Sequence, residues 1–322
     1  MMLQRDLPTP GAAPCAAPAY HAAICDSFAG FAGVVARLAV RSLHAELSLY
    51  PKPGLVSPVD AGSHTDMDAG TFMRSLFALR HYFRRICLAG LRDAPFAQLK
   101  QLGIDAEAAM LDATGGINTH RGAIFSLGML CAAAGQVRAR GLALTPASLR
   151  AAMLARWGGA LAAHATSMAT PSSTAHHSNG LQVARRYAVG GAREEGALGL
   201  PSVFEVGVPA LDAALRRGAG VDMARTDALF ALMAHVSDSN VYHRAGPVGA
   251  DIVRAHAQRF LDLGGTAHPR WRAAALASHR DFVAQRLSPG GAADLLAASC
   301  LVHALCKLGG FDGLNARTGD EA

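Results

Sequence analysis

Apolar residues recur at every third or fourth position along most of this chain, and this spacing restricts the fold more than any other feature. Phe31, Val35, Leu38 and Leu49 follow it between residues 26 and 49. A period near 3.6 residues lines such side chains along one face of an α-helix. The same spacing predicts further helices over 69–90, 95–112, 120–140, 146–165, 222–237, 246–263, 269–286 and 290–308.

No segment alternates apolar and polar residues in the way that a half-buried β-strand does. We therefore predict an all-α fold, a single helical domain of about ten helices with functional loops between them. Residues 23–310 are expected to form this domain, after a disordered lead-in at 1–22 and before a flexible tail at 311–322. The Gly-rich segment 166–220 has no clear pattern.

The overall charge favours an anionic ligand without identifying it. The chain has 30 basic and 24 acidic residues, which gives a net charge of +6. Such a charge suits an enzyme that handles polyphosphate, and it also suits a weak nucleic-acid binder. The basic residues are spread along the chain without interleaved aromatic residues, so we do not expect a nucleic-acid partner.

Cysteine usage and hydropathy predict a soluble cytoplasmic protein. None of the six cysteines forms a CxxC pair, which indicates a reducing compartment and no zinc site. The first twenty residues contain no apolar core of the kind that a signal peptide has. The apolar stretch 122–135 is too short to span a bilayer, so no membrane association is expected.

The first loop with unusual composition holds Lys52 between Pro51 and Pro53. Proline fixes the backbone, so the lysine ammonium could be held in a defined place. An ordinary helix stop with a solvated lysine explains the same residues. The segment alone favours that simpler interpretation.

The loop at 62–68 places His64, Asp66 and Asp68 within five residues, directly before a predicted helix. Mg²⁺ takes oxygen ligands and usually binds together with phosphates, so this density of carboxylates suits a magnesium site made by Asp66 and Asp68. An N-cap explains Asp68 equally well. That alternative leaves His64 and Asp66 without a role.

The segment 113–122 combines a Gly-Gly turn with Asn118, Thr119, His120 and Arg121, in front of a long apolar stretch. Asn118 or Thr119 can cap the following helix, and the free N–H groups of a helix N-terminus attract an anion. The arginine adds a fork of donors suited to phosphate. A plain capped turn needs no such set of side chains, so we predict an anion-binding loop.

Two more segments contain glycine pairs, and each has an alternative interpretation. Arg193 follows the first pair, in a segment that could bind phosphate or simply start a helix. Gly290 and Gly291 are poor helix formers at the start of a predicted helix, which suggests close approach by a ligand or by another backbone. Glu107 lies two turns before the glycines of the 113–122 segment, where a solvated helix face is the alternative.

Asp238, Asn240 and Arg244 follow the predicted helix 222–237. A carboxylate at a helix C-terminus is electrostatically disfavoured. We therefore expect Asp238 to face a cation, either a metal ion or an arginine.

Together these segments resemble the triphosphoribosyl-dephospho-CoA synthase family. The matching strings cover most of the chain between residues 30 and 305 in the family's order, which makes chance agreement a poor explanation. They are PKPGLV (51–56), GSHTDMD (62–68), TGGINTHRGAIFSLG (114–128), GAREE (191–195), DSNVYHR (238–244) and LSPGGAADLLA (287–297).

The resemblance implies a pentosyltransferase whose substrates are ATP and 3′-dephospho-CoA. Such an enzyme transfers the 5-triphosphoribosyl group to the 2′-hydroxyl of dephospho-CoA and releases adenine. Its product is the prosthetic-group precursor of the acyl-carrier protein of malonate decarboxylase or citrate lyase, and the sequence looks more similar to the malonate decarboxylase branch. The implied partners, reached through the product, are that acyl-carrier protein and its phosphoribosyl transferase. The sequence leaves the oligomeric state open.

The chemistry of this reaction suggests roles for the residues singled out above. Breaking an N-glycosidic bond builds positive charge on the ribose carbon, and a base must deprotonate the attacking hydroxyl. Asp66, Glu107 and Asp238 are the catalytic candidates, with Mg²⁺ expected at Asp66 and Asp68. The candidates for substrate and phosphate binding are Lys52, His64, Asn118, Thr119, His120, Arg121, Arg193, Asn240, Arg244, Gly290 and Gly291.

The chain departs from the family pattern at Asn179, Gly196 and Ala245, where the family usually has His, Ala and Gly. Asn179 matters most, because an amide replaces an ionisable group. If that histidine is catalytic in relatives, this chain is expected to be slow or altered.

Two other functions use the same residues. A Mg²⁺-dependent hydrolase of nucleotide N-glycosidic bonds would release free ribose triphosphate, whereas a transferase forms a new adduct with dephospho-CoA. A helical nucleotide-binding module would bind without turnover, and nucleic-acid binding would depend steeply on salt.

Overall fold

The computed structural model describes residues 27–167 and 191–315. Every regular element within these ranges is helical, which confirms the all-α prediction. The expected lead-in at 1–22 and the departure at Asn179 lie outside the described residues. The elements are α2 (Phe28–Leu47), α3 (Ala69–Leu91), α4 (Phe96–Thr114), α5 (Arg121–Ala139), α6 (Pro146–Ser167), α8 (Ala192–Ala197), π-helical η1 (Ser202–Gly207), α9 (Val208–Arg216), α10 (Val221–His235), α11 (Ser239–Asp262), 3-10 helical η2 (Gly265–Ala267), α12 (Trp271–Ala284) and α13 (Gly290–Asn315).

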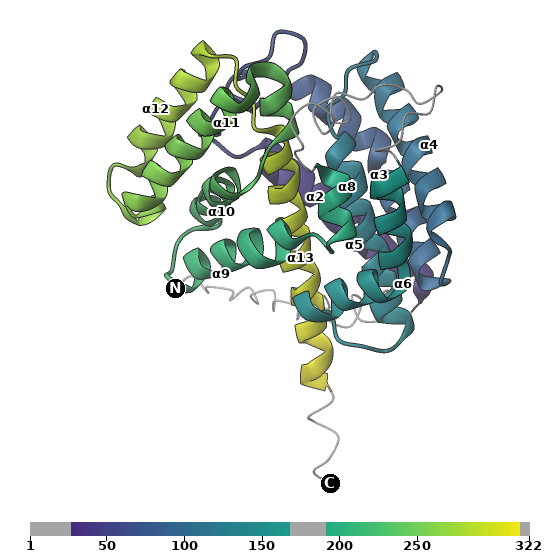
Figure 1. Cartoon of the computed structure of the whole chain (residues 1–322). Coiled ribbons are helices and arrows are strands. Elements are labelled where there is room, and N and C mark those ends of the chain that lie inside the picture. Colours follow the sequence, from purple (N-terminus) through teal and green to yellow (C-terminus); the bar gives the residue numbers. More distant parts are fainter. Residues whose placement is uncertain (1–26, 168–190, 316–322) are drawn as a thin grey trace, which may run out of the picture.

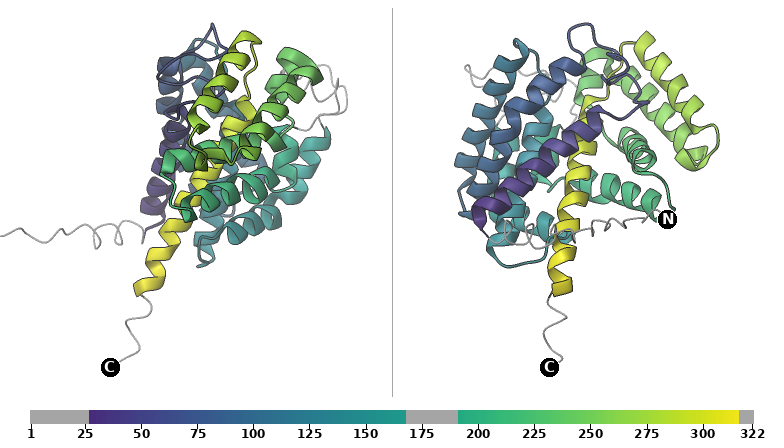
Figure 2. Two further views of the ribbon diagram at one scale, coloured as in Figure 1. Left: turned by 90° about the vertical axis from the view of Figure 1, so that its left-hand side faces the viewer. Right: turned by 180° about the vertical axis from the view of Figure 1, so that it is seen from behind.

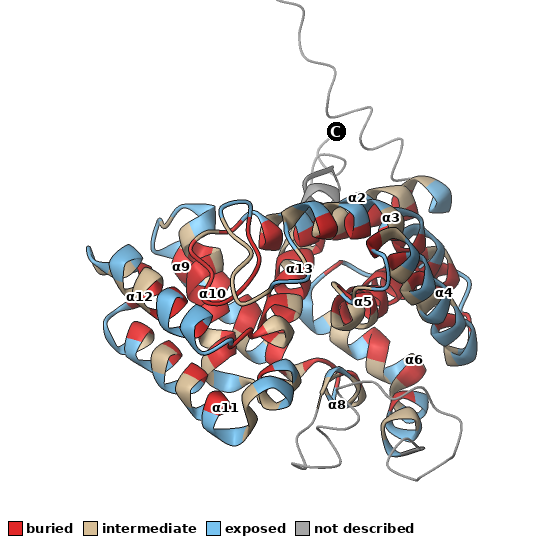
Figure 3. Cartoon of the chain, turned by 90° about the horizontal axis from the view of Figure 1, so that it is seen from above, coloured by how far each residue is buried: buried red, intermediate tan, exposed pale blue. Residues whose placement is uncertain are grey.

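Helix α13 runs through the middle of the molecule (Figure 1). Helices α2 to α6 lie on one side of it and α9 to α12 on the other, as the view from behind also shows (Figure 2). Helix α13 packs against α2 and α5 from the first group and against α9 and α10 from the second. Figure 3 shows that buried residues gather on the faces that these helices turn toward one another. The described helices therefore share one hydrophobic core.

Within residues 27–167 and 191–315, two helical stretches are long and apolar enough to cross a membrane, namely α5 and the Gly290–Leu308 part of α13. The expectation that no apolar stretch reaches that length was therefore wrong. Of these stretches, 78% and 61% of the residues are buried inside the protein. Their central positions account for their apolar character, because a helix surrounded by others is hydrophobic on all sides.

Glycines let α3 and α5 pack at close range. A side chain at Gly90 would collide with the backbone of Ala132, and one at Gly135 would collide with the backbone of Cys87. The amide of Gln136 donates to the carbonyl of Gly90 over 2.7 Å, across the same contact. This packing fixes the position of α5, whose N-terminus belongs to the site described below.

The prediction of a loop after residue 237 was wrong, because α11 already begins at Ser239. The chain is non-helical inside α11 at Gly246, with φ 63° and ψ −159°, and Pro247 follows. Proline lacks the N–H that a continuous helix needs. The apolar period therefore indicated only the part of α11 beyond this kink.

The segment 166–220 gave no pattern, and its described part, from residue 191, contains α8, η1 and α9. Helix α8 has six residues and η1 has six. Elements of six residues complete fewer than two turns, so no apolar period can develop in them. The nine residues of α9 bury Val208, Leu211 and Ala214 at a helical spacing, which the sequence prediction missed.

Candidate active site

A cavity of about 1510 Å³ opens between the two groups of helices. Its lining residues come from α2, the loop before α3, and α3, α4, α5, α6, α8, α11 and α13. Pockets for one small ligand usually measure about 300–1,000 Å³. The cavity is therefore large enough for two such ligands together.

Basic side chains from four helices form one polar part of the wall. Lys100, Arg121, His164 and Arg193 line the cavity from α4, α5, α6 and α8. Burial lowers the pKa of His164, and the charges of Arg193 and Lys100 lower it further. Burial also lowers the pKa of Arg193, with Glu107 opposing that effect. We call Lys100, Arg121, His164 and Arg193 the Arg121 group.

The predicted anion-binding loop lies in this part of the wall. The Asn118 carboxamide oxygen accepts the Arg121 backbone N–H over 3.1 Å, so Asn118 caps α5. Thr119 also lines the cavity, and its buried hydroxyl has no hydrogen-bond partner within the protein. Glu107 accepts the Arg121 Nε–H over 2.7 Å, and about a third of each side chain is exposed. A bound anion could replace Glu107 as the partner of this half-exposed arginine.

A second polar part of the wall joins Arg244, His64 and Ser288, which we call the Arg244 group. Arg244 donates to the Ser63 carbonyl over 3.1 Å and lies 3.0 Å from His64 Nδ1. His64 Nε2 lies 2.8 Å from the Ser288 hydroxyl. Because the guanidinium has only donors, Nδ1 accepts and Nε2 carries the proton. Burial and then Arg244 lower the pKa of His64, which favours this neutral form.

Asp66 lines the cavity beside the Arg244 group. Its carboxylate lies 3.5 Å from His64 Nδ1, and 58% of the side chain is exposed. The sequence prediction that Asp66, His64 and Arg244 belong to one site is consistent with this geometry.

An ion pair between Lys52 and Glu46 occupies the wall behind these groups. Lys52 Nζ lies 2.5 Å from Glu46 Oε1, and the two side chains are 1% and 5% exposed. Burial lowers the pKa of Lys52, while the Glu46 carboxylate opposes that shift. The simpler interpretation of Lys52 as a solvated lysine was therefore wrong.

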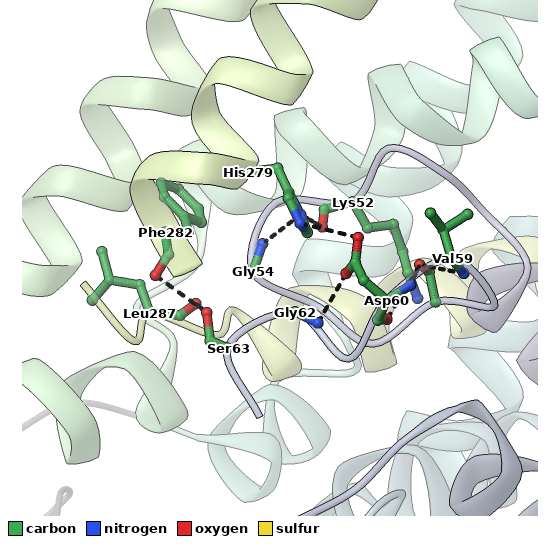
Figure 4. Close-up of polar contacts among 10 residues, drawn as sticks. Lys52, Gly54, Val59, Asp60, Gly62, Ser63, His279, Phe282 and Leu287 are labelled. Carbon is green, nitrogen blue, oxygen red and sulfur yellow. Dashed lines mark hydrogen bonds and ion pairs between the residues drawn. The ribbon is translucent and has the colours of Figure 1, made fainter. Parts of the chain in front are cut away.

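The backbone around Lys52 is held by α12, as Figure 4 shows. His279 Nδ1 donates to the Lys52 carbonyl over 3.0 Å, and its Nε2 lies 3.3 Å from the Asp60 carboxylate. The Ser63 hydroxyl donates to the Leu287 carbonyl over 2.6 Å. These contacts fix the loop that carries Lys52, His64 and Asp66 into the site.

Asp238 does not lie at the end of the helix that precedes it. It caps α11, with Oδ1 accepting the Asn240 N–H over 2.9 Å, and Oδ2 accepts the Ala292 N–H of α13 over 3.0 Å. The expected clash with a helix dipole was wrong, because Asp238 faces two helix N-termini. It is buried and does not line the cavity. Burial raises its pKa, and the backbone donors oppose that shift.

Asp68 and His120 also lie outside the cavity lining. Asp68 Oδ1 accepts the backbone N–H and the hydroxyl of Thr71 over 2.8 and 2.9 Å, so Asp68 caps α3. His120 is 2% exposed, and its Nδ1 lies 2.7 Å from the Ser75 hydroxyl. Burial and, to a smaller extent, the Lys52 charge lower the pKa of His120 to about 3. Asp68 is an exposed helix cap and His120 is a buried side chain, and neither lines the cavity in which a ligand would bind.

Asn240, Gly290 and Gly291 line the cavity as expected. The glycines leave room for polar side chains of α11. A side chain at Gly290 would meet the Asn240 amide at 2.9 Å, and one at Gly291 would meet Asp238 Oδ2 at 3.0 Å. The sequence predicted close approach by a ligand or another backbone at this glycine pair, whereas the nearest protein groups are the side chains of Asn240 and Asp238.

Asp294 is the most informative lining residue that the sequence prediction missed, together with Glu46, Lys100, His164 and Ser288. Asp294 is an acid within a run of apolar residues, and that irregularity was a usable signal for a buried functional group. Lys100 and His164 carried no comparable signal, because they sit on ordinary amphipathic helices.

Apolar side chains complete the cavity. Phe72, Phe96 and Phe125 line it together with Ile86 and Met129. Such a wall suits the flat face of a nucleobase, and the two cationic groups suit phosphates. The cavity can therefore bind two polyphosphate nucleotides and has buried acidic groups for acid–base chemistry.

Comparison with known proteins agrees with this interpretation of the cavity. Residues 32–312 match the sequence model of a family described as ATP:dephospho-CoA triphosphoribosyl transferase. No solved structure matches the chain.

Three relatives carry the same name, "Probable 2-(5''-triphosphoribosyl)-3'-dephosphocoenzyme-A synthase". The protein of Stutzerimonas stutzeri is 41% identical over 276 residues, which cover 84% of this chain and 91% of the relative. The protein of Acinetobacter calcoaceticus is 38% identical over 259 residues, which cover 80% of this chain and 86% of the relative. That of Vibrio cholerae is 35% identical, with coverages of 85% and 89%.

Proposed function

The chain belongs to the ATP:dephospho-CoA triphosphoribosyl transferase family, and from this premise we propose that it transfers the 5-triphosphoribosyl group of ATP to the 2′-hydroxyl of 3′-dephospho-CoA. The C1′–N9 bond of ATP breaks, adenine leaves, and a new C1′–O bond forms. The observation that carries this proposal is a single cavity of about 1510 Å³ with two separate cationic groups on its wall.

Each cationic group suits one polyphosphate. The Arg121 group brings Lys100, Arg121 and Arg193 to the cavity from three helices. The Arg244 group contains one permanent cation beside a neutral histidine. The triphosphate of ATP carries more charge than the pyrophosphate of dephospho-CoA, so we assign ATP to the Arg121 group and dephospho-CoA to the Arg244 group.

This assignment can be tested by comparing two arginine variants. Arg121→Gln should raise the KM for ATP by roughly 10-fold or more, the equivalent of a charge-assisted hydrogen bond worth about 1.5–3 kcal/mol, and leave that for dephospho-CoA nearly unchanged. Arg244→Gln should do the reverse. Equal effects of both variants on both substrates would contradict two separate phosphate sites.

Magnesium is expected beside the substrate phosphates, and the two aspartates that the sequence suggests as its ligands, Asp66 and Asp68, do not fit that role equally well. Asp66 lines the cavity with an exposed carboxylate, and Mg²⁺ in proteins is often held by one or two carboxylates and substrate phosphates. Asp68 fits less well, because it lies outside the cavity lining and its Oδ1 already accepts two hydrogen bonds from Thr71. The described residues contain no group of three or more His, Cys, Asp or Glu that could hold a metal on its own. When bound, the ion would neutralise phosphate charge.

Excess EDTA should therefore abolish turnover. Asp66→Asn should raise the Mg²⁺ concentration needed for half-maximal activity, whereas Asp68→Asn should leave that concentration unchanged. Full activity in EDTA would contradict the magnesium requirement.

The catalytic carboxylates that we propose from the sequence candidates are Asp66 and Glu107, which both line the cavity. Either could stabilise the positive charge that builds on the ribose carbon. Asp238 does not suit this role, because it caps two helices and lies outside the cavity lining.

The product would serve as the prosthetic-group precursor of an acyl-carrier protein, with malonate decarboxylase the favoured client over citrate lyase. The sequence resemblance supports this choice. Loading of purified product onto both carrier proteins by their phosphoribosyl transferases would decide between the clients. We also propose that the enzyme works in the cytoplasm, where ATP and dephospho-CoA are available.

The decisive experiment follows adenine from ATP with and without dephospho-CoA. Transfer predicts that adenine appears only with dephospho-CoA, in equal amount to a new nucleotide adduct. Adenine and free ribose triphosphate without the acceptor would support a hydrolase instead. Binding of ATP without release of adenine under either condition would support a nucleotide-binding module.

A further inference from the structure

Asp294 is an acidic residue on an apolar part of α13 that faces the cavity. Its neighbours Ala293 and Leu295 are buried, whereas the Asp294 carboxyl lines the cavity. Its Oδ2 lies so close to Gly122 that any side chain at residue 122 would collide with it. The Ala123 backbone N–H donates to the same carboxyl. Asp294 therefore contacts the start of α5 directly.

Asp294 lines the same cavity as both cationic groups and is connected to each of them. Asp294 contacts Gly122, which directly follows Arg121 in the chain, so it lies next to the Arg121 group. Ser288 lies just before α13, the helix that carries Asp294, and it hydrogen-bonds to His64 of the Arg244 group. If the two groups hold ATP and dephospho-CoA, as the proposed function states, the two riboses meet between them, beside Asp294.

The surroundings of Asp294 favour its uncharged form. Burial raises its pKa well above the usual range, and the carboxylates of Glu46 and Asp238 raise it further, against the Ala123 N–H. Lys52 is paired with Glu46 and does not bond to Asp294. A carboxyl whose protonated form is favoured in this way can act as a proton donor.

We propose that Asp294 donates the proton that adenine takes up as it leaves, a role that rests on the proposed transfer reaction. As the C1′–N9 bond breaks, its electron pair goes to adenine, and a ring nitrogen of adenine accepts the Asp294 proton. As the C1′–O bond forms, the 2′-hydroxyl of dephospho-CoA loses one proton. That proton restores the Asp294 carboxyl by the end of the turnover, so protons balance.

Asp294→Asn keeps the shape of the side chain and removes the proton that it donates. With ATP, the variant should turn over roughly 100-fold more slowly or worse, the usual scale for general-acid help. With 7-methyladenosine triphosphate, whose cationic base leaves without a proton, the variant should approach the wild-type rate. Equilibrium binding of ATP should be nearly unchanged, which separates this role from substrate binding.

The matched control is Arg121→Gln, which should slow the reactions of both nucleotides by the same factor, because its role is phosphate binding. If Asp294→Asn is equally slow with both nucleotides, or normal with both, Asp294 is not the acid, while the transfer reaction itself stands. If the wild type releases no adenine from ATP in the presence of dephospho-CoA, the proposed function fails and the role of Asp294 fails with it.

Discussion

Lys52 and Glu46 form a buried ion pair whose energetics suggest a function. Removing two charges from water costs several kcal/mol per ion, and their attraction often does no more than offset that cost. A pair of apolar residues would fill the same space without this cost. The pair lines the cavity beside Asp294, so we attribute it to the chemistry of the site.

His120 should make the fold sensitive to acid. Its pKa falls from the ordinary 6.5 to about 3 in the folded protein, so between these values the unfolded chain binds one more proton. Stability is therefore lost as pH falls from about 6.5 toward 3, by about 1.4 kcal/mol per pH unit for one proton. Urea unfolding of wild type and His120→Asn across this range should show that the variant lacks this part of the slope. Ser75→Ala keeps the imidazole, so a lost slope in that control would contradict the assignment to His120.

At the scale of elements, helix packing and capping determine which parts of the site could be predicted from the sequence. The lysine loop, the 62–68 loop and the 113–122 segment were found because their composition is unusual for connections, and all three contribute to the cavity wall. Asp238 was misplaced because the apolar period of α11 begins only after the kink at Gly246. An acid within an apolar run marked Asp294 as unusual, but its proximity to Ala123 of α5 and to the charge of Glu46 could not be predicted from that local signal.

The close packing of α3 on α5 predicts a strong effect of one methyl group. Gly90→Ala should lower the free energy of unfolding by about 1–3 kcal/mol, because its Cβ would collide with the Ala132 backbone, which cannot rotate away. Gly159→Ala is the matched control. It lies in α6 with no atom near its Cβ position and should stabilise by about 0.4–1 kcal/mol. Equal effects in chemical denaturation would contradict this account of the interface.

The two aspartate caps predict effects of different size for the same substitution. Asp238 uses both oxygens to accept N–H groups from α11 and α13, and an amide offers one acceptor. Asp238→Asn should therefore lower the free energy of unfolding by about 1–3 kcal/mol. Asp68 accepts both of its bonds on one oxygen, so Asp68→Asn should cost less than about 1 kcal/mol. Thermal melting of the two variants decides this, and an Asp238→Asn variant as stable as wild type would contradict the double cap.

At the scale of the whole molecule, described helices that lie far apart in the sequence meet around the cavity, and the sequence could not predict this. The helices themselves follow from local periodicity, but their arrangement around α13 depends on contacts between residues far apart in the chain. The Glu46 carboxylate raises the pKa of Asp294 although nearly 250 residues separate the two in sequence. Only the family's order of motifs indicated in advance that these segments meet.

Because the wall extends from Glu46 of α2 to Asp294 of α13, bound substrates should stabilise the described helices as one unit. A ligand at 100 times its Kd adds about 2.7 kcal/mol to the free energy of unfolding. ATP should therefore raise the Tm by several degrees within a single calorimetric transition, and dephospho-CoA should do the same. Arg121→Gln should reduce the shift caused by ATP and keep that caused by dephospho-CoA, since the variant alters only one phosphate site. Two transitions, of which ATP moves only one, would show instead that the helix groups on either side of α13 unfold independently and that the cavity does not couple them.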